Sequence, residues 1–316
     1  CSNFSENTMG IGAGIGIANF GFDDARGFWK WVDICDNGGV DSIWQSDRII
    51  DQVPNLEAMS VMAALAGGSK NVKFGMNVAS LGLRNPILTA KQCATIDVLS
   101  EGRLLPAFGV GSAFSKDFIA TGTPTKGRGR RTDEGLEIMA RLWREDNVSF
   151  EGEYYHLDDA TIAPKPIQQP LPLWLGGSAK QAIERTATWG TGWQAGIETA
   201  TDVAPVISAI KTRTAELGRK ISDDHFGAGF GFRFGNADEA IVSKYHSGLK
   251  KRLGRDPDGF TAVGGVEQMM ALVHDFHAAG VHKFILRPIA QGTEDMINQT
   301  RQMVEKLIPE IEALNH

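Results

Sequence analysis

The stretch that decides the fold runs from Val72 to Ser112 and reads VKFGMNVASLGLRNPILTAKQCATIDVLSEGRLLPAFGVGS. Its first apolar run, Val72–Ala79, predicts a buried strand. Pro86 then opens a segment with apolar residues at helical spacing, which Ser100–Arg103 ends. A second apolar run, Leu104–Val110, predicts another strand. Strand, helix and strand in about forty residues form a βαβ unit, whose two strands must be parallel.

The rest of the chain repeats this unit. Six further strands are predicted, each with a helical pattern after it: Ile11–Ala18, Val40–Gln45, Leu171–Leu175, Thr191–Ala195, His225–Phe234 and Val281–Leu286. Eight such repeats predict an α/β fold, the (β/α)8 TIM barrel, which typically takes ~250 residues or more. We therefore expect residues 1–316 to form a single barrel domain.

Insertions are expected after the fourth and seventh strands. After the fourth strand, Phe114–Arg131 is rich in Gly, Thr and basic residues and predicts a long loop, with an amphipathic helix starting at Thr132. Val148–Leu157 predicts a hairpin around Glu151-Gly152. After the seventh strand, the sequence GRDPDG predicts an inserted turn.

Composition narrows the class of protein. The formal net charge of −6 is spread without long acidic or basic runs, which gives no support for nucleic-acid binding. No apolar run approaches the ~20 residues of a membrane span, and the polar N-terminus CSNFSENTMG does not look like a signal peptide. The three cysteines form no CxxC pair, so we expect reduced, small buried thiols: Cys1, Cys35 and Cys93. These features predict a cytoplasmic protein without a membrane partner.

A barrel of this type carries its chemistry at the C-terminal ends of its strands. The polar or Gly-rich residues at those ends are Asp47 and Arg48, Asn77 to Ser80, Ser112 to Asp117, Gly176 to Ser178, Trp193 and Gln194, and Arg287. The sequence has no HxH or HExxH pattern, so no metal site is expected. It also lacks a GxSxG elbow and a prominent carboxylate pair, which argues against a serine hydrolase and a glycosidase.

One of these groups, Gly176-Gly177-Ser178, lies between a predicted strand and a predicted helix. Two glycines let a phosphate approach the backbone, and the first N–H groups of the helix and the Ser178 hydroxyl are donors for it. The same three residues also suit an ordinary tight turn, and both interpretations remain open. Asp47 is likewise either a fixed charge beside a planar ring or a surface carboxylate.

The sequence resembles the superfamily of bacterial luciferase-like flavin monooxygenases and deazaflavin (coenzyme F-420) oxidoreductases. The resemblance covers Ile11 to about Ala195 well and the last third loosely. The motifs that carry it are VDSIWQSD (Val40–Asp47), NPILTAKQCATIDVLSEGR (Asn85–Arg103), FGVGS (Phe108–Ser112), RTDEGLEIMARLW (Arg131–Trp143), FEGEYYHL (Phe150–Leu157) and PLPLWLGGS (Pro170–Ser178).

This resemblance implies a cofactor site by position. Asn77 and Val78 are expected under the flavin ring, where family members often have a non-prolyl cis peptide. The cofactor phosphate is expected on Gly176–Ser178, and Asp47 is expected to face the edge of the ring. Ser112, after the fourth strand, completes the expected cofactor-binding residues.

Two positions depart from one branch of the superfamily. In the deazaflavin sugar-phosphate dehydrogenases a His follows the strand-two Asp and a Glu lies in the loop after strand four, but here those places hold Arg48 and Phe114. Neither residue supplies the acid–base pair that dehydrogenation needs. The resemblance therefore favours a monooxygenase that uses reduced FMN and O2 on a small organic substrate. A deazaflavin-dependent hydride transfer and a non-catalytic flavin-binding relative remain as alternatives.

The catalytic residues expected for this function are Asp47, Arg48 and Arg287. Arg287 follows the last buried run and precedes Pro288, so it should end the eighth strand. There it either offers a planar fork of donors to an anionic or carbonyl group or forms a structural salt bridge with a neighbouring loop acid. The family also implies a homodimer and allows for a separate flavin reductase as a partner.

Overall fold

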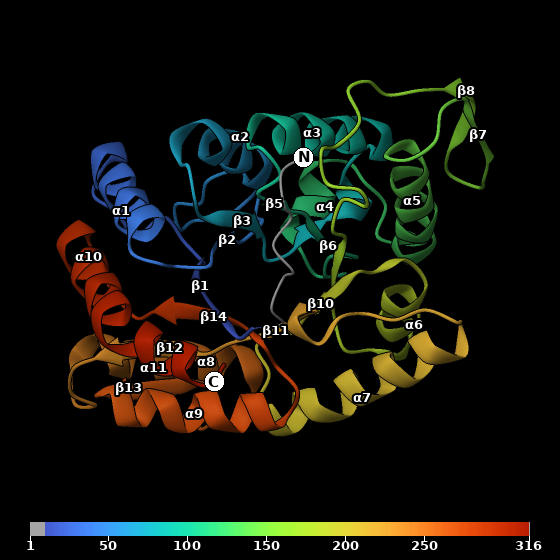
Figure 1. The fold of residues 1–316 in the computed structure, drawn as a ribbon. Coiled ribbons are helices and arrows are strands. Elements are labelled where there is room, and N and C mark those ends of the chain that lie inside the picture. The colour runs from blue at the N-terminus through green and yellow to red at the C-terminus, as the bar shows by residue number, and fades with distance from the viewer. Residues whose placement is uncertain (1–9, 316) are drawn as a thin grey trace. The chain divides into compact units, whose positions relative to one another are not determined.

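The computed structural model describes residues 10–315 (Figure 1). The chain divides into two compact units. The terminal unit comprises residues 10–17, 21–43 and 195–315, and the central unit comprises residues 18–20 and 44–194. Over the described range, no helix combines the length and the apolar character that crossing a membrane requires.

The central unit is built on short parallel strands. β3 (Lys73–Met76) pairs with β5 (Leu104–Leu105), and β4 (Ala79–Ser80) pairs with β6 (Ala107–Gly109). β6 then pairs with β9 (Trp174–Gly176), which pairs with β10 (Gly192–Gln194). All four pairings are parallel, which confirms the βαβ organisation predicted from Val72–Ser112.

Helices connect these strands. They are α2 (Ala58–Gly68), the short 3-10 helix η1 (Leu81–Leu83), α3 (Pro86–Leu99), α4 (Lys116–Ala120), α5 (Arg128–Leu142) and α6 (Lys180–Trp189). α3 begins at Pro86 as predicted, because the Asn85 side chain caps it by accepting from the amides of Ile87 and Leu88 at 3.0 and 3.1 Å. The free thiols of Cys35 and Cys93 are buried, as predicted, whereas Cys1 lies outside the described residues.

Two of the buried indoles in the core of the central unit contact each other. Trp44, in β2 (Ser42–Gln45), and Trp174 meet edge to face with ring centroids 5.7 Å apart. Two glycines make room for them, because a Cβ at Gly75 would come within 2.6 Å of the Trp44 ring and one at Gly192 within 2.6 Å of the Trp174 ring. Packing against the two indoles therefore restricts positions 75 and 192 to glycine.

The predicted hairpin is present, and the predicted loop before it is partly wrong. β7 (Val148–Glu151) and β8 (His156–Ala160) pair antiparallel beside α5 (Figure 1). The segment Phe114–Arg131, however, contains α4, whose Phe118 is buried and whose first turn is capped by Ser115. α5 starts at Arg128 rather than Thr132, because Gly127, at φ +76°, serves as its N-cap.

The terminal unit is also of the α/β class. Its strands are β1 (Gly12–Ile17), β11 (Phe226–Ala228), β12 (Gly231–Phe234), β13 (Thr261–Gly264) and β14 (Lys283–Pro288). β14 pairs parallel with β1, β11 and β12, and β12 pairs parallel with β13. β13 was not predicted, because its four residues are mostly half-exposed and form no apolar pattern.

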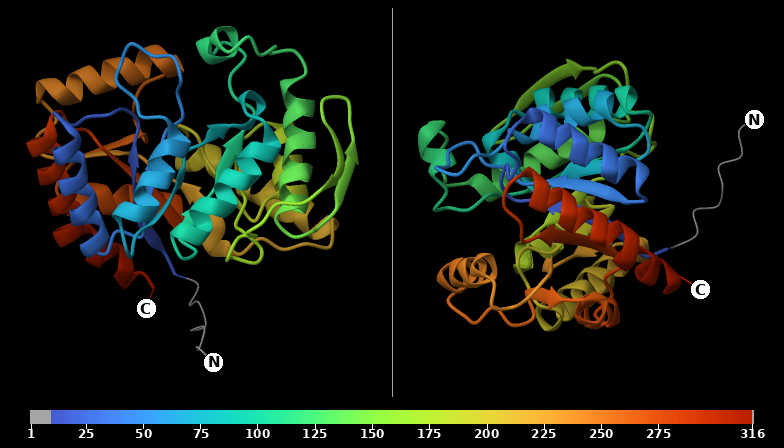
Figure 2. Two further views of the ribbon diagram at one scale, coloured as in Figure 1. Left: turned by 90° about the horizontal axis from the view of Figure 1, so that it is seen from above. Right: turned by 90° about the vertical axis from the view of Figure 1, so that its left-hand side faces the viewer.

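The helices of the terminal unit are α1 (Ala25–Asn37), α7 (Ala200–Glu216), the short η2 (Asp223–His225), α8 (Ala240–Leu253), α9 (Val266–Ala278), α10 (Thr293–Gln302), the π-helical η3 (Met303–Leu307) and α11 (Ile308–Ala313). α1 lies beside α10 (Figure 2), and the Trp31 indole N–H donates to Thr300 Oγ1 at 2.8 Å. The last helical segment is interrupted between α10 and α11 at η3, just before Pro309, which has no N–H for an i→i−4 bond.

Candidate functional site

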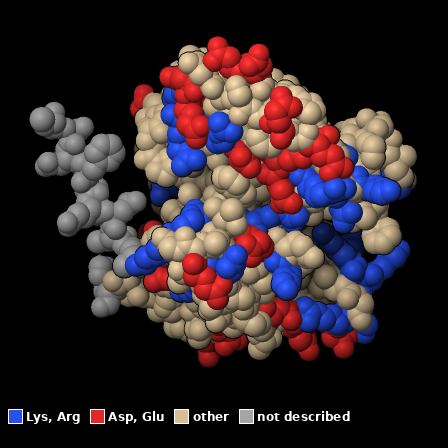
Figure 3. All heavy atoms as spheres, turned by 90° about the vertical axis from the view of Figure 1, so that its right-hand side faces the viewer, with Lys and Arg blue, Asp and Glu red and all other residues tan. Residues whose placement is uncertain are grey.

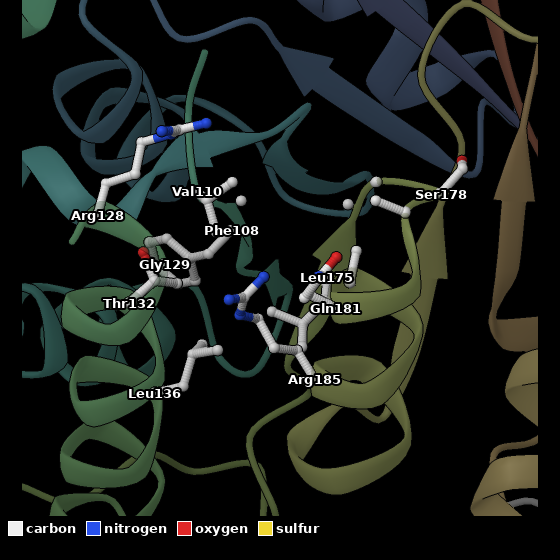
Figure 4. Close-up of a pocket in the computed structure, with 15 residues that line it drawn as sticks. Phe108, Val110, Arg128, Gly129, Thr132, Leu136, Leu175, Ser178, Gln181 and Arg185 are labelled. Atoms are coloured by element: carbon white, nitrogen blue, oxygen red, sulfur yellow. The ribbon is translucent and has the colours of Figure 1, made fainter. Parts of the chain in front are cut away.

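A cavity of about 340 Å³ lies within the central unit, between α5 and α6 and at the C-terminal ends of β6 and β9 (Figure 4). This volume falls in the range of ~300–1,000 Å³ typical of ligand pockets. Its lining residues are Phe108, Gly109, Val110, Arg128, Gly129, Thr132, Leu136, Leu175, Gly176, Gly177, Ser178, Ala179, Gln181, Ala182 and Arg185. The predicted phosphate residues, Gly176–Ser178, are therefore part of a cavity.

The N-terminus of α6 opens into this cavity without a cap of its own. Gly177 has φ +110°, which glycine tolerates and other residues resist. The N-cap residue is Ala179, and no described side chain accepts from the first amides of the helix as a cap. Ser178 Oγ is buried and has no hydrogen-bond partner within residues 10–315. Several donors are thus available to an anion at this end of α6.

Gly109, Gly176 and Val78 form the surface next to the N-terminus of α6. A Cβ at Gly176 would come within 3.0 Å of the Val78 side chain, and one at Gly109 within 2.9 Å. Val78 therefore lies directly over the ends of β6 and β9, and any side chain at either glycine would displace it. The Asn77–Val78 peptide is cis, as the resemblance implied.

The charged residues that line the cavity are both cationic. Arg128 donates from Nε to the Gly111 carbonyl at 3.3 Å and forms no ion pair with any described carboxylate. Arg185 pairs with Asp133, and Figure 4 shows it reaching from α6 toward α5. The cavity is therefore suited to an anion, although the net charge of the chain is −6. Figure 3 shows one face of the molecule on which basic and acidic side chains are interspersed. The net charge of the chain therefore does not determine the charge around any one site.

A second unpaired hydroxyl lies at the other side of the cavity. Thr132, on α5, is 1% exposed, and its Oγ1 has no hydrogen-bond partner in the described part of the chain. Figure 4 places Thr132 across the cavity from Ser178. The apolar side chains of Phe108, Leu136 and Leu175 also line the cavity. Polar groups on two sides and apolar side chains in the lining suit a ligand with an anionic group on a largely apolar body.

Asp47 is held in a buried cluster at the strand ends. Its carboxylate accepts from the Ser80 amide at 2.9 Å and from Arg84 Nη2 at 2.5 Å, and Arg84 also pairs with Glu57 at 3.2 Å. Burial raises the pKa of the Asp47 carboxyl above its usual value, and Arg84 beside it offsets part of that rise. Because Ser80 lies two residues after Val78, Asp47 supports the turn that carries the cis peptide.

The other predicted residues lie in different surroundings. Arg48 pairs with Asp51 at 2.6 Å, and 43% of its side chain is exposed. Ser112 Oγ accepts from the Phe114 amide at 3.2 Å.

Arg287 belongs to the terminal unit and lies at the end of β14 as predicted, although the strand runs to Pro288 rather than ending at Leu286. Its amide donates to the Phe230 carbonyl and its Nη2 to the Gly229 carbonyl, each at 3.0 Å.

Four polar residues of the cavity were not predicted from the sequence: Arg128, Thr132, Gln181 and Arg185. A signal for some of them was present, since Arg128, Thr132 and Leu136 recur every fourth residue and so share one face of a helix. This signal was hidden because the helix was predicted to start only at Thr132. Gln181 and Arg185 follow the Gly-Gly-Ser turn by less than two helical turns and share a face in the same way.

Comparison with known proteins identifies the class of this chain. The family model described as luciferase-like monooxygenase matches residues 4–257. The chain therefore belongs to the luciferase-like monooxygenase family, as the motifs between Val40 and Ser178 indicated. The match extends further toward the C-terminus than the well-covered range expected from those motifs, which ended near Ala195.

Particular relatives differ in the cofactor that their names state. An F420-dependent glucose-6-phosphate dehydrogenase of Kineococcus radiotolerans is 32% identical over 163 residues, which is 49% of this chain and 48% of that protein. An FMNH(2)-dependent dimethylsulfone monooxygenase of Pseudomonas putida is 34% identical over 142 residues, 42% of this chain and 38% of that protein. The chain thus spans about half the length of the curated relatives that it matches.

Solved structures show the same fold at low sequence identity. The monooxygenase RslO1 from Streptomyces bottropensis superposes with a TM-score of 0.82 and 18% identity, covering 95% of this chain and 99% of that one. At this identity the likeness concerns the fold alone. It agrees with the α/β class, built on parallel strands, that the sequence predicted.

Proposed function

We propose that this protein is a flavin-dependent monooxygenase that uses reduced FMN and O2 on a small organic substrate. The observation that carries the proposal is the uncapped N-terminus of α6, which opens into a cavity beside the unpaired Ser178 hydroxyl. Membership of the luciferase-like monooxygenase family supports it. The glycines at 109 and 176 support it too, since they leave the strand ends flat enough for Val78 to cover them.

The residues of the central unit fit a phosphorylated flavin. The α6 amides and Ser178 would bind its phosphate, with Arg128 adding positive charge. Val78 would contact the ring, and Asp47 would hold the turn that positions Val78. When bound, the flavin ring supplies the redox chemistry, while the protein orients it and excludes water. The catalytic roles of Asp47, Arg48 and Arg287, and the contact of Ser112 with the cofactor, remain predictions.

A deazaflavin-dependent hydride transfer is the second candidate, because several curated relatives are named F420-dependent glucose-6-phosphate dehydrogenases. The phosphate residues serve either cofactor, since both carry a phosphate on the chain attached to the ring. Arg48 and Phe114, in the places where that branch has His and Glu, favour the first candidate. The third alternative, a non-catalytic flavin-binding relative, predicts a filled pocket, and the 340 Å³ cavity counts against it.

Finer features belong to the same proposal. We infer one closed (β/α)8 barrel over residues 1–316, with insertions after its fourth and seventh strands. The β7–β8 hairpin, between β6 and β9, and β13, between β12 and β14, are consistent with those positions. A homodimer, a separate flavin reductase and a cytoplasmic location remain expectations from the sequence.

Titration of the purified protein with FMN and with deazaflavin F-420, followed by fluorescence, tests this function. We expect tight binding of FMN and, with reduced FMN, consumption of O2 that a substrate couples to product. Preference for F-420 with little reaction with O2 would transfer the proposal to hydride transfer. Binding of neither cofactor would overturn it, and binding without any turnover over a panel of small organic substrates would favour the non-catalytic alternative.

A further inference from the structure

Gln194, the last residue of β10, is buried with an unpaired amide. Its side chain is 0% exposed, and neither Nε2 nor Oε1 has a hydrogen-bond partner among the described residues. A buried polar group without a hydrogen-bond partner destabilises the fold, so native proteins rarely keep one without a function. The amide thus has one donor side and one acceptor side available to a ligand.

The sheet places Gln194 on the same face as the Val78 surface. In the parallel register between β9 and β10, Trp174 lies beside Gly192 and Gly176 lies beside Gln194. Residues in register point to one face of a sheet. A Cβ at Gly192 would meet the Trp174 ring, and one at Gly176 would meet Val78. Gln194 therefore points to the face where Val78 covers Gly176.

The neighbouring residue of β10 points the other way and is paired. The Trp193 indole N–H donates to the Gly177 carbonyl at 2.8 Å, so it fixes the turn that leads into α6. Trp193 and Gln194 thus link the phosphate end of the site to the Val78 face. One residue holds the turn and the next presents an open amide.

A second buried glutamine at a strand end shows what an ordinary structural amide does. Gln45, the last residue of β2, is 2% exposed, and its Nε2 donates to the Ser46 carbonyl at 3.0 Å and to the Leu56 carbonyl at 3.5 Å. Its donors are therefore used by the backbone. Gln45 and Gln194 share residue type, burial and strand position, and differ in whether the fold pairs the amide.

We propose that Gln194 binds the pyrimidinedione edge of the flavin or deazaflavin ring, an inference that rests on the proposed function. That edge carries an N–H next to a carbonyl, which matches the acceptor and donor of one carboxamide in a paired, bidentate contact. Gln194 thereby sets how the ring lies on Val78, while α6 binds the phosphate. Because FMN and F-420 share this edge, the assignment holds for either cofactor.

The test compares Gln194→Met with wild type, using FMN and N3-methyl-FMN, in which a methyl group replaces the ring N–H. Wild type should bind FMN on the order of 10-fold more tightly than N3-methyl-FMN, since the methyl group leaves the Gln194 acceptor unpaired. The Met variant should bind FMN about 10-fold more weakly than wild type and lose this discrimination. Its ligand-free Tm should rise, because Met removes the unpaired amide.

Gln45→Met is the matched control. It should lower the ligand-free Tm, because it removes paired hydrogen bonds, and leave the Kd for FMN and the discrimination unchanged. Wild-type FMN affinity with intact discrimination in Gln194→Met would overturn the inference. If that variant fails to fold, wild type alone decides, since equal affinity for FMN and N3-methyl-FMN would also overturn it. Failure of wild type to bind either FMN or F-420 would instead reject the proposed function.

Discussion

The first backbone N–H groups of a helix lack partners within the helix, and α6 and α7 differ in whether a side chain supplies one. α7 begins after Thr199, which forms a capping box: the Thr199 hydroxyl accepts from the Asp202 amide, and the Asp202 carboxylate accepts from the Thr199 amide at 2.8 Å. Arg255 then pairs with the Asp202 carboxylate. α6 begins after Ala179, and no described side chain caps it.

This difference indicates function rather than a demand of the fold. Both helices follow a short strand of parallel pairing, and α7 shows that this chain caps such a helix with ordinary residues. A good cap contributes about 0.5–2 kcal/mol, which α6 forgoes. The open end also has Ser178 unpaired beside it and Arg128 in the same cavity. An external anion at α6 would supply what Asp202 supplies at α7.

The largest effect is expected when α6 is given a cap like that of α7. In Ala179→Asp the new carboxylate should accept from the first amides of the helix, because the Ala179 backbone is already extended (φ −71°, ψ 155°) as an N-cap requires. Ligand-free stability should rise by about 1 kcal/mol. FMN affinity should fall on the order of 100-fold, since two charge-assisted contacts are lost and the charges repel. Thermal unfolding and fluorescence titration measure the two effects.

Ala179→Asn serves as its control, because it caps the helix without adding charge. It should raise stability similarly and weaken FMN less than Asp does. If Ala179→Asp binds FMN as wild type does, the phosphate does not lie at α6 and the contrast with α7 has no functional meaning.

A smaller loss is expected from removing the unpaired cation. Arg128→Ala should weaken FMN on the order of 10-fold, consistent with one charge-assisted contact of about 1.5 kcal/mol, and should flatten the dependence of affinity on salt. The matched control is Arg130→Ala, two residues along, whose side chain is 65% exposed and pairs with Glu153. Equal salt dependence in Arg128→Ala and wild type would remove Arg128 from the site.

Much of the fold could be predicted because buried strands and capped helices leave strong local patterns. α3 was predicted to open at Pro86, where it begins, since a proline in the first turn is a strong local signal. β13 could not be predicted, because its strand conformation depends on non-local pairing with β12 and leaves no pattern in its own residues. The early start of α5 depends on the positive φ of Gly127, which sequence alone does not reveal.

The site was predictable only where chain order places its parts together. Gly176–Ser178 are consecutive and lie at a strand-to-helix turn, so their grouping followed from the sequence. Arg128 was missed because the start of its helix was placed four residues too late, and Gln194 was recognised only as a polar residue at a strand end, since its unpaired amide depends on tertiary packing. The pairing of Asp47 with Arg84 is likewise non-local, so the sequence left Asp47 as either a functional or a surface carboxylate.

The smallest effect is expected at α7, where the cap is structural. Hydrogen bonds from Arg255 and from Thr199 hold the pKa of the Asp202 carboxyl well below the value of about 3.9 that is usual for an aspartic acid. A depressed pKa means that the ionised carboxylate stabilises the folded state above the unfolded-state pKa, and that this contribution is lost as pH falls through the lower folded-state pKa. Asp202→Asn should therefore reduce the free energy of unfolding by about 1 kcal/mol at pH 7, a modest loss because the pair is partly exposed. The difference from wild type should shrink steadily below about pH 4, and FMN affinity should not change.

Asp256→Asn is the control, since Asp256 forms an exposed pair with Lys250 and should have no such effect. Chemical denaturation at pH 7, 4 and 3 measures the difference, and a loss of stability that grows toward acid pH would contradict the assignment of Asp202 as the cap of α7.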